Sequence, residues 1–123
     1  MSLFQTDSLV LCYSNLGAGK DWWIKTFDCK QSPLPGWDDP LPSDVALKLP
    51  GSDTPTILLR SRSEAGFAGE NDHPIVFAGN LKKAYKYLVD KGASPGPIQD
   101  GGGTQFFEIR DPEGGVIEVC QEV

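Results

Sequence analysis

Short apolar runs separated by glycine, proline and polar residues dominate the pattern along the chain. Runs of this length predict strands, whereas two stretches show the spacing of apolar residues that is typical of a helix. We expect strands at residues 8–13, 44–49, 56–62, 74–78, 105–110 and 116–121, and helices at residues 19–27 and 80–91. Residues 63–72 are polar and contain glycine, which favours a linker.

The second helix carries the clearest signals. Leu81, Ala84, Tyr85 and Leu88 form one apolar stripe in residues 80–91. Asn80 stands at the N-cap position and Gly92 at the C-cap position. Between the last two strands, residues 111–115 read Asp-Pro-Glu-Gly-Gly, a good turn sequence. Residues 101–103 are three glycines, for which we expect a flexible loop.

The order of strand, helix and about three strands occurs twice. A shift of 65 places residues 10, 11 and 15–16 on residues 75, 76 and 80–81, and a shift of 60 places residues 57–59 on residues 117–119. Each half alone would bury too little surface, so the two halves are expected to share one core.

The strands have two different faces, because side chains alternate along a strand. One face is almost wholly apolar and should pack on the helices: Leu9, Leu11, Tyr13, Ile57, Leu59, Pro74, Val76, Ala78, Ile117 and Val119. The other, here called the mixed face, combines apolar and polar groups: Ser8, Val10, Cys12, Ser14, Thr56, Leu58, Arg60, Arg62, His73, Ile75, Phe77, Val116, Glu118 and Cys120. A mixed face is compatible with a ligand pocket and equally with a half-solvated sheet.

His73, the one histidine in the sequence, shares the mixed face with Glu118. A histidine and a carboxylate can form half of a metal site, but an ion pair or a structural role for His73 is also open. Arg60 and Arg62 lie on the same face. They could neutralise Glu118 or hold an anionic group of a ligand.

Composition narrows the function classes. The 123 residues include 11 Lys and Arg and 17 Asp and Glu, a net charge of −6, which argues against nucleic-acid binding. No apolar run reaches the length of a membrane span, and no signal peptide is evident. Three cysteines without a CxxC pair favour a reducing compartment, so we expect a cytoplasmic protein with Cys12, Cys29 and Cys120 packed as small apolar groups.

Two glycine-rich segments are similar to known phosphate-binding and dinucleotide-binding motifs but lack residues or a position that these motifs require. Residues 17–20 read Gly-Ala-Gly-Lys, which is similar to the end of a phosphate-binding loop. Such a loop would need glycine at position 14 and serine or threonine at position 21, where this chain has Ser14 and Asp21. The glycines at 101–103 do not join a strand to a helix, so the dinucleotide motif is absent.

Residues 106–119 (FFEIRDPEGGVIEV) strongly resemble the C-terminal signature of the vicinal oxygen chelate superfamily, the glyoxalase / bleomycin-resistance / dioxygenase group, with Gly115 where asparagine is usual. Residues 73–81 resemble its second-module strand, with Asn80 in place of aspartate. Residues 15–29 are similar to its first-module helix segment, with several substitutions.

The resemblance implies an α+β fold with two βαβββ modules that form a curved, cup-like mixed sheet with the helices outside. We expect a single domain over residues 1–123, with modules 5–62 and 73–123 joined by the linker 63–72, and a homodimer. Metal-dependent members take ligands from the first and last strand of each module, which implies Ser8, Leu58, His73 and Glu118 here. Leu58 cannot coordinate a metal and Ser8 is a poor ligand, so this site would be incomplete.

Resistance-type members, which bind a drug in the cup without a metal, therefore resemble the chain better. We expect a small organic ligand, with Arg60, Phe77, Trp37, Phe106 and Glu108 as binding residues. Tyr13 is a further aromatic candidate, although its position in the strand alternation places it on the face that packs on the helices. The acidic chain suits a cationic ligand, although Arg60 and Arg62 argue for the opposite charge.

Two other functions stay open. One is a metal-dependent lyase, isomerase or dioxygenase with Zn, Ni, Fe or Mn on His73, Glu118 and a third ligand. Glu108, Glu64 and Asp7 are the candidates for that third position. The other is a scaffold that only dimerises.

Overall fold

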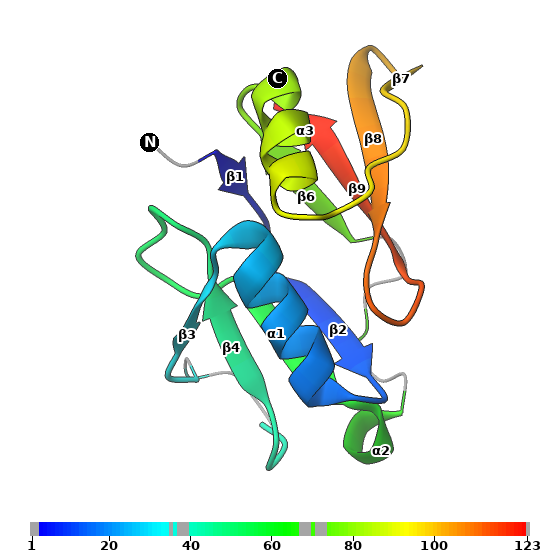
Figure 1. The fold of residues 1–123 in the computed structure, drawn as a ribbon. Helices are drawn as coiled ribbons and strands as arrows, with labels where there is room; N and C mark the ends of the chain where they lie inside the picture. Colours follow the sequence, from blue (N-terminus) through cyan, green and yellow to red (C-terminus); the bar gives the residue numbers. More distant parts are fainter. Residues whose placement is uncertain (1–2, 35, 37–39, 67–69, 71–73, 123) are drawn as a thin grey trace.

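The same strand order occurs in both halves of the computed structural model, which describes residues 3–34, 36, 40–66, 70 and 74–122. The elements are β1 (Phe4–Gln5), β2 (Leu9–Tyr13), α1 (Leu16–Phe27), β3 (Lys30–Ser32), β4 (Val45–Lys48), β5 (Ile57–Ser61), α2 (Arg62–Ala65), β6 (Ile75–Ala78), α3 (Leu81–Asp90), β7 (Gln99–Gly101), β8 (Thr104–Arg110) and β9 (Val116–Gln121). Figure 1 shows α1 in front of β2 and α3 in front of β6.

Each half is a βαβββ unit whose first strand lies beside its last. The first sheet has the order β2-β5-β4-β3, and the second has β6-β9-β8-β7 with β1 added at the β6 edge. In both, the pair of first and last strands is parallel and the remaining pairs are antiparallel. The expected α+β fold with two such modules is thus confirmed.

Strand register confirms the internal repeat. Val10 lies opposite Leu58 in the first sheet, and Ile75 lies opposite Glu118 in the second. These pairs are related by the shifts of 65 and 60 residues predicted from the sequence. The helices begin alike, because the side chain of Asn15 accepts a hydrogen bond from the N–H of Ala18, and that of Asn80 accepts one from the N–H of Lys83.

Some elements differ from the expectation. α1 begins at Leu16 rather than at residue 19, because Asn15 caps it. The strands β1, β3 and β7 were not predicted, since each has only two or three residues and no apolar alternation. The short helix α2 covers residues 62–65, which are the last residue of an expected strand and the first three residues of the expected linker.

The three glycines at 101–103 do not form a flexible loop. Gly101 pairs with Thr104, and Gly102 and Gly103 have φ of 62° and 86°. A two-residue hairpin turn with positive φ at both positions is the type I′ turn, which glycine adopts without strain. These glycines therefore fix the register of β7 on β8.

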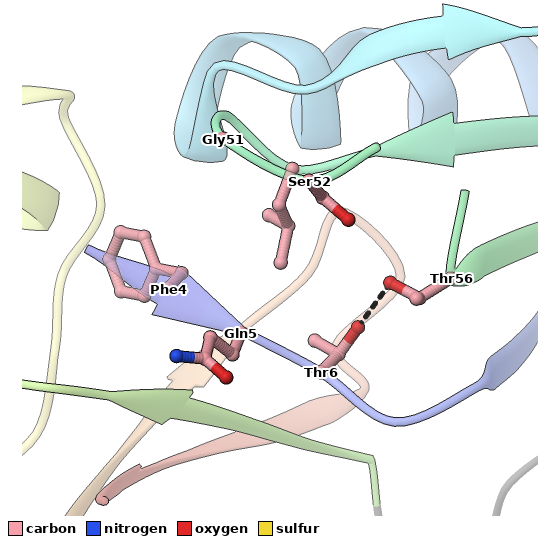
Figure 2. A pocket seen from close by; sticks show the side chains of 7 residues that line it. Phe4, Gln5, Thr6, Gly51, Ser52 and Thr56 are labelled. Carbon is pink, nitrogen blue, oxygen red and sulfur yellow. Dashed lines mark hydrogen bonds between the residues drawn. The ribbon is translucent and has the colours of Figure 1, made fainter. Parts of the chain in front are cut away.

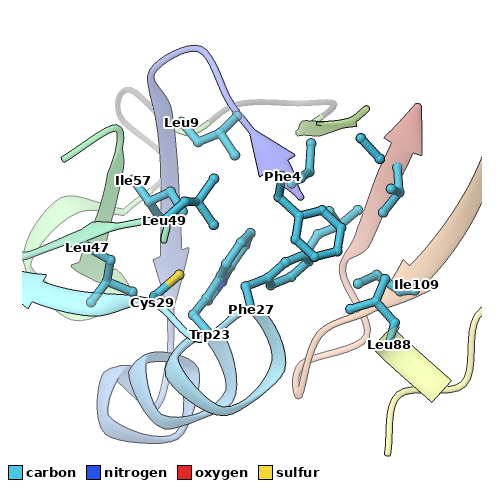
Figure 3. Close-up of a cluster of buried hydrophobic side chains, with 14 of the residues drawn as sticks. Phe4, Leu9, Trp23, Phe27, Cys29, Leu47, Leu49, Ile57, Leu88 and Ile109 are labelled. Carbon is cyan, nitrogen blue, oxygen red and sulfur yellow. The ribbon is translucent and has the colours of Figure 1, made fainter. Parts of the chain in front are cut away.

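The apolar strand face packs on the helices as predicted. Leu9, Leu11, Ile57 and Leu59 of the first sheet and Val76, Ala78, Ile117 and Val119 of the second join one core cluster. Figure 3 shows Trp23 and Phe27 of α1 in its middle, beside Phe4. Cys12, Cys29 and Cys120 are free and buried, also as expected. Of the described helices, none is long and apolar enough to cross a membrane.

Asp28 joins the ends of the two long helices. It follows α1 with a positive φ of 54°, and its carboxylate accepts hydrogen bonds from the Tyr87 hydroxyl and from Lys91 Nζ, the latter at 2.9 Å. These two donors lower the pKa of Asp28 below its ordinary value of 3.8. The carboxylate thus stabilises the contact between α1 and α3 in its ionised form.

We expect Asp28→Asn to lower the free energy of unfolding at neutral pH by about 0.5 kcal/mol, a small loss because the ion pair is solvent-screened. Since the native pKa is lowered, the contribution exists above the unfolded-state pKa and is lost as the pH falls through the native one. The difference between variant and parent should therefore shrink in acid. Urea titrations at several pH values measure it, with Asp90→Asn as a charge-matched control. A difference that stays constant down to the acid transition would contradict this role.

Candidate functional site

The mixed face of the second sheet carries two rows of neighbouring side chains. Ile75 lies opposite Glu118, which lies opposite Glu108. In the next row, Phe77 lies opposite Cys120, which lies opposite Phe106. All of them are half-buried except Cys120, which is buried outside the helix-covered core. This face therefore offers an apolar row flanked by carboxylates.

A cavity of about 420 Å³ opens on this face. Phe77 and Cys120 line it together with Thr104, and the remaining lining residues are Gln5, Thr6, Asp7, Gln121 and Glu122. The apolar residues come from β6 and β9, whereas the segment after β1 contributes polar groups. A few polar groups around an apolar floor, in a volume of a few hundred Å³, are typical of small-molecule sites.

Cys120 and Glu118 form one unit at the edge of this cavity. The Cys120 thiol donates a hydrogen bond to Glu118 Oε1 at 3.0 Å. Burial, together with that hydrogen bond and the charge of Glu118, raises the pKa of the thiol to about 12. Cys120 is thus a protonated thiol at neutral pH, and it orients a carboxylate rather than acting as a thiolate nucleophile.

On the first sheet, Arg60 is tied to a carboxylate of its own module. Its Nη2 lies 3.1 Å from Asp44 Oδ2, and its Nε donates to the same carboxylate. The Asp44 side chain is only 1% exposed. The sequence interpretation paired Arg60 with Glu118 or a ligand anion and missed Asp44. The signal was available, because the hairpin that pairs Val45 with Leu59 brings the next residues, 44 and 60, together.

Arg62 is similarly tied to Glu70. Its two terminal nitrogens donate to both oxygens of that carboxylate, at 3.1 and 2.9 Å. The pair also covers the free edge of β2, since Arg62 donates to the carbonyl of Cys12 at 2.7 Å and Glu70 accepts from its N–H at 3.4 Å. An ion pair thus replaces the neighbouring strand that β1 provides for β6. Glu70 was not predicted, because no local pattern connects the linker to this edge.

The aromatic residues predicted to bind the ligand do not all lie at the cavity. Phe77 lines the cavity and Phe106 lies on the same face. Tyr13 does not, and that candidate was wrong. It is 1% exposed within the core and accepts a hydrogen bond from Trp23 Nε1 at 2.9 Å. Trp37 lies outside the described residues.

The predicted metal ligands are not assembled in the part of the chain that the structure describes. There, no three His, Cys, Asp or Glu side chains are placed to hold one ion. His73 lies outside the described residues. Leu58 is buried hydrocarbon, and Glu64 accepts hydrogen bonds from Ser43. Glu108 lies opposite Glu118, and Asp7 lines the cavity.

Two further cavities are present, and Glu108 of the first mixed row lines the larger of them together with Arg110. One of about 400 Å³ is lined by Trp22, by residues of the segment between α3 and β7, and by Ile109 and Val116. The other, of about 280 Å³, lies between β1 and the turn after β4. Figure 2 shows Thr6 and Thr56, which both line it, pointing toward each other. Their hydroxyls form a hydrogen bond of 2.5 Å.

Glu113, in the turn that carries the family-like Asp-Pro-Glu-Gly sequence, connects the two modules. Its carboxylate accepts hydrogen bonds from the N–H groups of Ser14 and Asn15, at 3.0 and 2.9 Å. Burial opposes its ionisation, but these hydrogen bonds outweigh burial and lower the pKa of Glu113. The motif thus has a structural use here, at the start of α1.

Solved structures are similar to this chain over nearly its whole length. A member of the glyoxalase/bleomycin resistance protein/dioxygenase superfamily from Sphaerobacter thermophilus DSM 20745 has 20% identity, coverage of 96% of this chain and 97% of its own, and a TM-score of 0.68. TnmS3, an antibiotic binding protein from Streptomyces sp. CB03234, has 15% identity, coverage of 97% and 96%, and a TM-score of 0.71. A lactoylglutathione lyase from Agrobacterium tumefaciens has 18% identity, coverage of 95% and 92%, and a TM-score of 0.68.

No protein-family model and no curated protein sequence matches the chain. The structural similarity therefore establishes the fold, which agrees with the strand order and the repeat described above. This chain has the glyoxalase/bleomycin-resistance/dioxygenase fold, and its structural neighbours include members of that superfamily.

Proposed function

We propose that this protein binds a small organic molecule on the mixed face of the second sheet, without a complete metal centre. The cavity of about 420 Å³ floored by Phe77 and Cys120 carries this proposal. Cavities of this size accommodate drug-sized ligands, and rings such as Phe77 supply apolar contact area. One structural neighbour is an antibiotic binding protein, which supports the same use of the fold.

The ligand residues implied for a metal also support a metal-free site. Of the four positions, Leu58 offers only hydrocarbon. Glu118 accepts a hydrogen bond from the Cys120 thiol. We further propose a homodimer, as the family resemblance implies, with one domain built from modules 5–62 and 73–123.

Three naphthalene probes of equal ring size test the proposal. They are (2-naphthylmethyl)trimethylammonium, 2-naphthylmethanol and 2-naphthylmethanesulfonate, which are cationic, neutral and anionic. We expect at least one to bind in equilibrium dialysis. Thr104→Phe, which fills the mixed-face cavity, should reduce that binding at least about tenfold, since the ring occupies the ligand volume.

Ser94→Phe is the matched control, because it places the same ring in the cavity beside Trp22. It should leave probe binding unchanged, and prior treatment with a chelator should have no effect. Failure of all three probes to bind, or loss of binding in Ser94→Phe alone, would refute the proposed site.

A further inference from the structure

We infer that the ligand of the mixed-face cavity is an organic cation carrying an aromatic or apolar body. This inference rests on the proposed function and adds the charge of the ligand. It depends on how the charged side chains of the two sheets are distributed. The composition alone could not decide it, because Arg60 and Arg62 share the mixed face.

Arg60 of β5 and Arg62, the first residue of α2, are both matched by carboxylates of the same chain. Arg60 and Asp44 lie 3.1 Å apart, with side chains 15% and 1% exposed. Arg62 and Glu70 lie 2.9 Å apart, with side chains 25% and 21% exposed. Each guanidinium donates at least two hydrogen bonds to its carboxylate. The positive charge that would attract an anionic ligand is therefore compensated within the protein.

The charged groups at the cavity of the second sheet are acidic. Of the described residues that line this cavity, Asp7 and Glu122 are charged, and none is a lysine or arginine. Glu118 lies 3.0 Å from the lining thiol of Cys120, and Glu108 lies directly opposite Glu118. Arg110, at the far end of β8, donates to the carbonyl of Gly114 at 2.9 Å. We therefore expect a negative potential in the cavity, which would concentrate cations and repel anions.

The apolar floor suits the same ligand. Phe77 lines the cavity, and Phe106 lies beyond Cys120 in the same row. The face of a phenyl ring attracts a cation, so ring and carboxylates act in the same direction.

The three naphthalene probes separate this inference from the proposed function. We expect the ammonium probe to bind at least about tenfold more tightly than the neutral and sulfonate probes at low salt, with the preference falling as salt is added. Glu118→Gln and the double variant Asp7→Asn with Glu122→Gln should each weaken binding of the ammonium probe about threefold or more and leave the neutral probe unaffected. Asp90→Asn, which removes the same charge from the exposed end of α3, should change neither.

Equal or tighter binding of the neutral or sulfonate probe, lost in Thr104→Phe, would overturn the cation inference and leave the proposed site intact. Absence of binding for all three probes would overturn both. Thermal unfolding of each variant confirms that the substituted proteins are folded before their binding is compared.

Discussion

Gly19→Ala is expected to destabilise the protein by about 2 kcal/mol, although alanine is the better helix former. An added Cβ at Gly19 would lie 2.5 Å from Cδ2 and 2.7 Å from Cγ of the Tyr13 ring. That ring is 1% exposed and is held by the hydrogen bond from Trp23, so it has no room to move. The overlap therefore outweighs the gain in helix propensity.

Gly17→Ala is the matched control in the same helix. Gly17 is exposed, and its added Cβ would meet only Asn15 Oδ1, at an ordinary 3.7 Å. We expect a neutral effect or stabilisation of up to about 1 kcal/mol. Thermal unfolding should thus show a melting temperature roughly 8 °C lower for Gly19→Ala and no decrease for Gly17→Ala. A shift in the same direction for both variants would contradict the packing described for Tyr13.

Phe4→Ala is expected to cost about 3 kcal/mol, as truncation of a buried phenylalanine does. The Phe4 ring is 3% exposed and makes edge contacts with Phe27 and Tyr87, at centroid distances of 5.0 and 5.5 Å. It is the principal anchor of β1, which has only two residues paired with β6. Urea titration measures the loss, with Val89→Ala, an exposed apolar truncation, expected to change stability by less than about 0.5 kcal/mol.

The same variant should weaken probe binding, because β1 positions Gln5 and Thr6 at the mixed-face cavity. Detachment of β1 from β6 would remove one wall of that cavity and with it Gln5, the strand partner of Phe77. A loss of less than about 1 kcal/mol, or unchanged binding in a destabilised Phe4→Ala protein, would contradict the role assigned to β1.

Much of the fold could be predicted because the decisive signals are local. Apolar alternation placed the long strands, and Asn80 marked a helix start. The shifts of 65 and 60 residues predicted an internal repeat, and the registers of the two sheets match that repeat. β1 could not be predicted, since two residues carry no period and its partner β6 is some seventy positions away. The Gly102–Gly103 turn was misjudged because glycine permits both a loose loop and a tight turn.

The charged part of the site was less accessible to sequence reasoning. Parity correctly placed Phe77, Cys120 and Glu118 on the face opposite the helices. It gave no information on which carboxylate each arginine selects, because that depends on tertiary distance. Asp44 was accessible from the hairpin register, whereas Glu70 reaches Arg62 through a segment without a pattern. Because both arginines pair with carboxylates, they do not give the ligand site the positive charge that their presence in the sequence suggested.

The most direct test of the central claim is to locate the bound probe, by a crystal structure of the protein with (2-naphthylmethyl)trimethylammonium. We expect the naphthalene ring against Phe77 and Cys120, with the ammonium group toward Glu118 or toward Asp7 and Glu122. A probe found in the cavity beside Trp22, or between β1 and the turn after β4, would contradict the assignment of the mixed face of the second sheet as the ligand site.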